Sequence, residues 1–171
     1  SALTGHYSSS YGFEVDIPRH HTALPSAVVG DHGVRISLAT PTVNLPGSME
    51  FYAAFNVLSW NTADEAAQVH VEWLREQASR NVVTVMSRKP VAIHGIPGVR
   101  VVVSYRDKDS RSETICDEII LLRSRESGDR LGDEPDFAYT FGVTTTGKEY
   151  TAGRLLFERV LATARFSAPD E

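Results

Sequence analysis

The sequence of 171 residues contains a single cysteine, Cys116. One cysteine cannot form an intramolecular disulfide, so the fold depends on its core, and cysteine usage indicates neither an oxidising nor a reducing compartment. No apolar run approaches the roughly 20 residues that a spanning helix requires, so no membrane span is expected. The net charge is -5 with no concentrated basic face. This balance argues against a nucleic-acid partner.

Sequence motifs of several enzyme classes are also missing. Neither phosphate-binding pattern, G-x-x-x-x-G-K-[ST] or G-x-G-x-x-G, occurs, and there is no G-x-S-x-G elbow. Asp117 and Glu118 are consecutive on a predicted strand and face opposite ways, which makes them a poor acid and base pair. Cys116 lies in the same strand without an adjacent base, so we expect a buried, inert thiol. We therefore predict no enzyme, no catalytic residue and no cofactor.

The composition is that of an ordinary globular domain. Hydrophobic residues make up 42% of the chain and charged residues 23%. A chain of this length can bury most of its apolar surface in one core. We predict one domain over residues 1–171, with frayed ends at 1–6 and 167–171.

The centre of the predicted fold is the stretch 91–123. Three apolar runs separated by turn residues predict a β-meander, with a short strand, a tight turn at 94–98 and two long strands. Residues 119–122 are apolar at both strand parities, which predicts a strand that is covered on both faces. Alternating apolar residues or apolar runs predict further strands at 11–17, 34–38, 51–60, 82–86 and 137–143.

Two helices are expected. Thr62 and Glu65 have the spacing of a capping box, so a first helix should begin there and end near Arg80. A second helix should span about 148–165, capped by Thr145 or Thr146. The expected buried stripe of the first helix is Ala66, Val69, Trp73, Leu74 and Ala78, and that of the second is Gly153, Leu156, Phe157, Val160, Leu161 and Ala164. The fold class is therefore α+β, a mostly antiparallel sheet flanked by helices in an α/β/α sandwich.

Aromatic residues and one long loop complete the pattern. Trp60, Trp73, Tyr139 and Phe141 fall at core spacings, and we interpret them as packing residues. The polar stretch 123–136 predicts a projecting loop, where a partner surface could lie.

Three histidines before the second strand, His20, His21 and His32, are weak metal candidates. Adjacent residues of an extended chain point to opposite sides, so His20 and His21 are poorly placed to hold one ion. We expect a solvated loop there and no metal site. His70 lies on the first predicted helix, without a carboxylate or a second histidine one turn away.

Several segments together resemble the PsbP-like group, which includes photosystem II PsbP, DcrB-type bacterial lipoproteins and Ran-binding Mog proteins. They are Y-S-S-S-Y-G-F-E-V-D-I-P at 7–18, a capped helix containing Trp73, G-I-P-G-V-R-V at 95–101, and a closing aromatic strand with an amphipathic helix. The resemblance spans nearly the whole chain. It implies the PsbP-like fold and a binding or accessory role, often outside the cytoplasm, with no shared catalytic residue.

Two functions remain open from the sequence. The leading hypothesis is a non-enzymatic accessory or protein-binding domain, of bacterial origin. The alternative is a domain that binds a small molecule or a metal, including a hydrolase, through the loop with His20, His21 and His32. If an export signal was removed before residue 1, the domain is periplasmic or secreted; otherwise it is cytoplasmic. The oligomeric state is not predicted.

Overall fold

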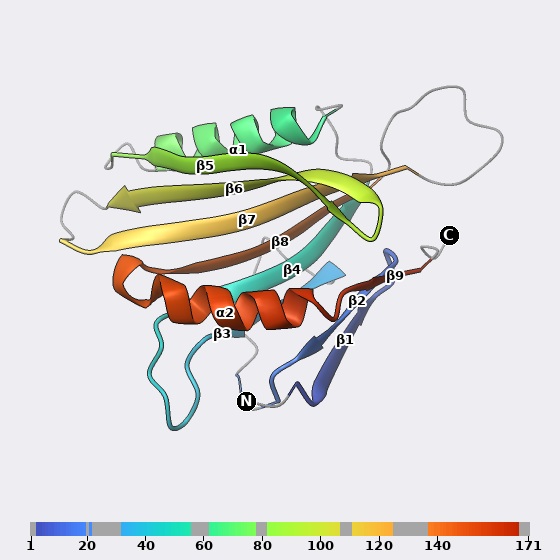
Figure 1. Cartoon of the computed structure of the whole chain (residues 1–171), viewed down its shortest axis with the longest axis horizontal. Helices are drawn as coiled ribbons and strands as arrows, with labels where there is room; N and C mark the ends of the chain where they lie inside the picture. The colour runs from blue at the N-terminus through green and yellow to red at the C-terminus, as the bar shows by residue number, and fades with distance from the viewer. Residues whose placement is uncertain are drawn as a thin grey trace.

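A six-stranded antiparallel sheet is the main element of the fold (Figure 1). The computed structural model describes residues 3–19, 21, 32–55, 62–77, 82–106, 111–124 and 137–167. The strand order is β3-β4-β8-β7-β6-β5. The strands are β3 (Gly33–Ser37), β4 (Gly47–Phe55), β5 (Thr84–Ile93), β6 (Ile96–Arg106), β7 (Glu113–Arg123) and β8 (Phe137–Thr146). The predicted antiparallel α+β class is confirmed.

A second, three-stranded sheet was not expected from the sequence. It has the order β1-β2-β9, with β1 (Gly5–Ser9), β2 (Phe13–Ile17) and β9 (Arg165–Phe166). Gly5 pairs with Ile17 and His6 with Asp16, so regular structure begins within 1–6, where we expected frayed chain. The sequence of β1 did not predict a strand, because Ser8 and Ser9 interrupt any alternation of apolar and polar residues.

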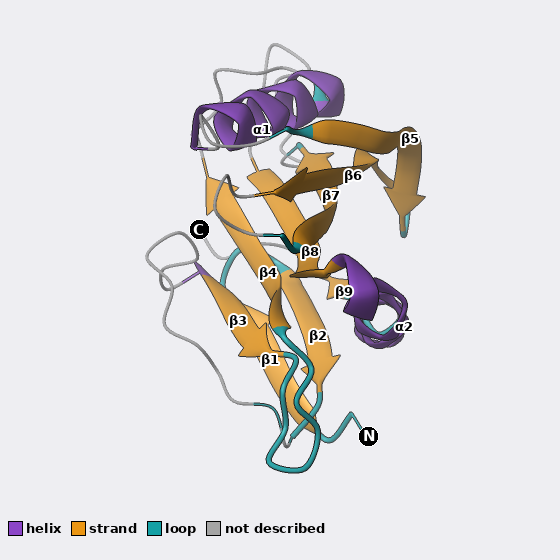
Figure 2. Ribbon diagram, turned by 90° about the vertical axis from the view of Figure 1, so that its left-hand side faces the viewer, coloured by secondary structure: helices purple, strands orange, loops and turns teal. Residues whose placement is uncertain are grey.

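The two helices cover opposite faces of the main sheet (Figure 2). Helix α1 (Ala63–Gln77) packs on β6 and β7, whereas α2 (Tyr150–Leu161) and the small sheet pack on the other face. Every residue from 115 to 122 on β7 is buried, as a strand covered on both sides requires. The predicted α/β/α sandwich is confirmed. Among the described residues, no helix is both long and apolar enough to cross a bilayer.

The meander is simpler than predicted. β5 runs without interruption through Lys89 and Pro90, so the strands expected at 82–86 and 91–93 are one. Among the strands that the structure describes, β5 lies at the edge of the sheet and pairs with β6 alone, and a proline is tolerated where its missing N–H would face solvent. The turn to β6 consists of His94 and Gly95, at φ 48° and 81°. Glycine favours that left-handed region, which explains the tight hairpin.

The helix starts differ from each other. At α1 the predicted cap is present, because the Glu65 amide donates to the Thr62 hydroxyl at 3.1 Å. At α2 the predicted cap is wrong. A 3-10 turn (Gly147–Glu149) precedes the helix, and Thr146 makes no side-chain capping bond. The Thr145 hydroxyl instead donates to the Pro46 carbonyl at 2.9 Å, since that residue points into the core.

We predict that Thr62→Ala lowers the free energy of unfolding by about 1 kcal/mol through loss of the α1 cap. For a chain of this size the thermal midpoint should fall by roughly 3 °C. Differential scanning calorimetry measures the change, and Thr146→Ala is the matched control, because that threonine caps nothing by its side chain. Equal shifts in the two variants would contradict the assignment of the cap.

Helix α1 buries Ala66 and Leu74, as the sequence predicted, but not Val69 and Trp73 of the same expected stripe. Its buried residues are Ala66, Ala67, Val71 and Leu74. Val69 and Trp73, expected in the core, are 46% and 49% exposed. Two adjacent alanines allow the helix to sit close to the valines of β6, and this rotates Val69 and Trp73 outward. Tyr139 and Phe141 are buried as predicted, whereas Trp60, Ala78 and residues 125–136 of the predicted loop lie outside the described residues.

Candidate functional site

A pocket of about 390 Å³ lies beside α1, on the part of the sheet formed by β4, β8 and β7. We call it the α1 groove. Trp73 and His70 of the helix form one wall, and strand residues form the floor. The floor residues include Glu50, Tyr52, Cys116, Glu118, Thr140 and Thr144. All six are at even positions of their strands, so the pleat of the sheet points them to the α1 side.

Three side chains with nucleophilic or metal-binding atoms converge in the α1 groove. His70 Nε2 lies 2.8 Å from Glu118 Oε2. Cys116 Sγ lies 3.9 Å from His70 Nε2 and 3.7 Å from Glu118 Oε2. Cys116 and Glu118 are two residues apart on β7 and share a face, whereas His70 comes from α1. We call these three residues the His–Cys–Glu cluster.

The cluster is mostly buried, and burial sets its protonation. Burial by itself lowers the pKa of His70, but the Glu118 carboxylate and the bond to Cys116 outweigh it and raise the value to about 10. Burial raises the pKa of the Cys116 thiol, and the neighbouring His70 offsets this only in part. The shifts in pKa therefore favour a protonated imidazole at His70 and a protonated thiol at Cys116.

This protonation is unsuited to a cysteine nucleophile. Such a nucleophile needs an adjacent base that accepts the thiol proton. His70 is paired with Glu118, and the Cys116 thiol donates to that same carboxylate at 3.7 Å. The arrangement fits a buried ion pair or a ligand set better than a catalytic dyad, and Cys116 is buried, as expected from the sequence.

The remaining floor of the groove is polar and half-buried. Arg35 Nε lies 3.2 Å from Glu50 Oε1. Burial raises the pKa of Glu50, with nearby Glu118 adding to the effect against the attraction of Arg35. Burial likewise raises the pKa of the Tyr52 hydroxyl. Trp73 lies nearly parallel to the His70 ring at 6.2 Å between centroids, so an indole borders the polar floor.

The opposite face of β7 carries a separate charge network. Asp117 is fully buried and accepts from Arg100 at 2.8 and 2.7 Å and from the Tyr150 hydroxyl at 2.8 Å. Arg100 also donates to Glu158 of α2 at 2.7 Å. Asp117 and Glu118 thus face opposite ways, as predicted, and each is paired with a cation from another element. Asp117 joins the sheet to α2, whereas Glu118 joins it to α1.

The histidines singled out in the sequence are not brought together. His21 Nδ1 donates to the Ser37 carbonyl at 2.7 Å, at the end of β3. His32 stacks on the Tyr11 ring at 4.2 Å and precedes the start of β3. His32 precedes the first residue of β3 and His21 contacts its last residue, so roughly 16 Å of extended strand separates the two histidines. His21 and His32 therefore cannot ligate one ion in this arrangement, and His20 lies outside the described residues.

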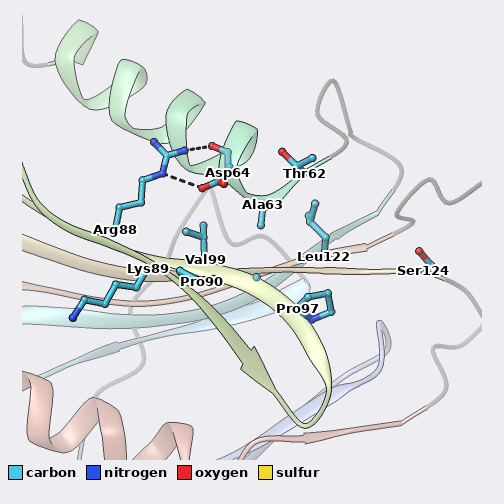
Figure 3. A pocket seen from close by; sticks show the side chains of 11 residues that line it. Thr62, Ala63, Asp64, Arg88, Lys89, Pro90, Pro97, Val99, Leu122 and Ser124 are labelled. Atoms are coloured by element: carbon cyan, nitrogen blue, oxygen red, sulfur yellow. Dashed lines mark hydrogen bonds and ion pairs between the residues drawn. The ribbon is translucent and has the colours of Figure 1, made fainter.

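A second hollow, of about 580 Å³, lies at the start of α1 (Figure 3). Arg88 of β5 donates to the Asp64 carboxylate at 3.1 Å and also to the Asp64 carbonyl, while Lys89 extends away from the helix. The charges of Arg88 and Asp64 are therefore paired with each other, and this pair links the edge strand to α1.

The sequence contained one usable signal for the His–Cys–Glu cluster. Cys116 and Glu118 share a strand face by period-two alternation. On its own helix His70 has no carboxylate one turn away. Its partner, Glu118, belongs to β7 and lies 48 positions later in the sequence. Only the packing of α1 across β7 brings the three together.

No protein-family model matches the sequence, and no curated protein matches it. The structure is similar to the solution structure of PsbP (CyanoP) from the cyanobacterium Synechocystis sp. PCC 6803, with a TM-score of 0.64, 9% identity and coverage of 98% of this chain and 95% of that one. It is also similar to PA94, a protein of unknown function from Pseudomonas aeruginosa, with a TM-score of 0.55, 13% identity and coverage of 84% and 95%. At these identities the likeness shows the fold alone. The chain has the PsbP-like fold, as the sequence resemblance implied.

Proposed function

We propose that this chain is a non-enzymatic accessory domain that binds another protein along the α1 groove. The observation that carries the proposal is the exposure of Trp73, which lines the groove; Val69, one helical turn before it on α1, is also exposed. A half-exposed tryptophan beside a pocket is typical of protein interfaces, where aromatic anchors supply much of the binding energy. The sequence resemblance supports the accessory role.

The groove suits a protein segment with both apolar and polar groups. Trp73 and Leu74 provide apolar surface, and Tyr52, Thr140 and Thr144 provide hydroxyl groups on the floor. The charged floor residues are already paired, Glu118 with His70 and Glu50 with Arg35. A partner therefore need not supply a compensating charge, and an apolar side chain flanked by backbone amides fits this lining best.

The proposal can be tested by placing a photo-crosslinking amino acid at position 69 in the source cells. The matched control is the same amino acid at position 155, since Leu155 is 63% exposed on α2, across the sheet. We expect one specific cross-linked protein from position 69 and none from position 155. Identical products from both positions would contradict the groove as the binding surface.

We predict that Trp73→Ala weakens binding of the cross-linked partner about 30-fold, because truncation of a tryptophan anchor costs about 2 kcal/mol. Trp73 is half exposed, so the thermal midpoint should change by no more than about 3 °C. Titration of the purified partner against both forms measures the loss. Unchanged affinity in a folded Trp73→Ala variant would contradict the proposed anchor.

A location outside the cytoplasm is part of this proposal, in line with the sequence resemblance. Fractionation of the source cells with an antibody against the chain tests it. We expect the signal in the periplasmic or secreted fraction, and a signal confined to the cytoplasm would contradict it.

A further inference from the structure

The His–Cys–Glu cluster has the donor atoms of a transition-metal site. Its imidazole nitrogen, thiol sulfur and carboxylate oxygen come from α1 and β7 and lie within 4.8 Å of one another. Thiol and imidazole donors favour zinc over magnesium or calcium, which prefer oxygen ligands only. All three residues line the α1 groove, so the cluster faces open space.

The spacing of the three atoms is close to that of a tetrahedral zinc site. With ordinary zinc bond lengths, sulfur lies about 3.6 Å from the nitrogen and the oxygen, and nitrogen lies about 3.4 Å from oxygen. In the structure the two sulfur separations are 3.9 and 3.7 Å, and the nitrogen to oxygen separation is 2.8 Å. Only the His70 and Glu118 atoms must move apart, by about 0.6 Å, which side-chain rotation allows.

Charge balance also suits a divalent ion. Zinc binds a thiolate, a carboxylate and a neutral imidazole, and any proton that these ligands carry is released to solvent on binding. The thiolate and the carboxylate together offset the double positive charge, so the ion adds no uncompensated buried charge.

A buried His70–Glu118 ion pair alone would explain two of the three residues. It leaves unexplained why a thiol stands within 4 Å of both partners, with all three lining the groove. A metal ion accounts for all three positions. We propose that His70, Cys116 and Glu118 bind one zinc ion, with its fourth coordination position open to the α1 groove. This inference rests on the cluster alone and does not depend on the protein-binding proposal.

The experiment uses the purified full chain, stripped of metal with a chelator, and titrates it with Co²⁺ and then Zn²⁺. Cobalt reports its ligands by absorption, because a thiolate ligand gives a charge-transfer band in the near ultraviolet and a tetrahedral site gives intense visible bands. We expect one equivalent of Co²⁺, both sets of bands, and their loss when Zn²⁺ displaces the cobalt.

Matched variants assign the ligands. Cys116→Ser should abolish the charge-transfer band, and His70→Gln should weaken zinc binding at least tenfold. His21→Gln and His32→Gln test the histidines outside the cluster and should leave both readings unchanged. Far-ultraviolet circular dichroism without metal shows whether each variant is folded. If His70→Gln does not fold, the cobalt spectrum of Cys116→Ser alone tests the proposal, because that substitution is nearly isosteric and should not disturb the fold.

Three outcomes would overturn the proposal. They are no cobalt binding, binding without a thiolate band, and zinc affinity unchanged in folded Cys116→Ser. None of these outcomes affects the cross-linking expected from position 69. The zinc site and the protein-binding surface are therefore tested independently.

Discussion

Replacement of Asp117 by leucine should remove about 3 to 5 kcal/mol from the free energy of unfolding. Asp117 is fully buried and is the acceptor for two guanidinium nitrogens of Arg100 and for the Tyr150 hydroxyl. Without it, Arg100 is left on a buried face with only Glu158, whose side chain is 40% exposed. Urea unfolding followed by circular dichroism measures the loss.

The control for this prediction is the double variant Arg100→Met with Asp117→Leu. A buried ion pair gains little over apolar residues of similar volume, because both charges must be desolvated. The double variant should therefore be more stable than Asp117→Leu alone, although the Tyr150 hydroxyl still loses its acceptor. If the double variant is no more stable than Asp117→Leu, the loss in that single variant does not come from leaving the Arg100 charge unpaired.

Phe157→Asp should prevent folding or lower stability by about 4 kcal/mol or more. The Phe157 ring is fully buried, packs at 5.7 Å from the Phe51 ring, and lies 5.9 Å from the Arg100 guanidinium. A carboxylate there would lose the aromatic packing and place a charge on the buried side of α2. Yield of soluble protein and the thermal midpoint are the measurements.

Leu155→Asp is the matched control, because Leu155 is 63% exposed two positions away on the same helix. The same substitution there should shift the thermal midpoint by no more than about 2 °C. Equal damage from both substitutions would mean that the buried face of α2 has been assigned incorrectly.

Helix α1 shows which features of a helix follow from its sequence pattern and which do not. The cap at Thr62 is a local interaction between residues three positions apart, and the bond from the Glu65 amide to the Thr62 hydroxyl is present as predicted. The choice of buried face is not local. The pattern of large apolar residues favoured Val69 and Trp73, but the sheet accepts the alanine-rich side, because a helix packs most closely where its side chains are small.

The same contrast holds for the charged residues. Period-two alternation correctly separated Asp117 and Glu118 onto opposite faces of one strand. Their partners could not be inferred. His70 is 48 positions from Glu118, and Arg100 is 17 positions from Asp117, so each pair exists only through the packing of separate elements.

By itself the sequence determined the α+β class, most strands, the start of α1 and the covered central strand, because these follow from short-range periodicity, capping and turn chemistry. The tertiary structure decided the rest. It set the register of β1 with β2, the rotation of α1, and the meeting of His70 with Cys116 and Glu118 in the α1 groove. Contacts between distant segments depend on which faces can pack together at native density, and no local pattern carries that information.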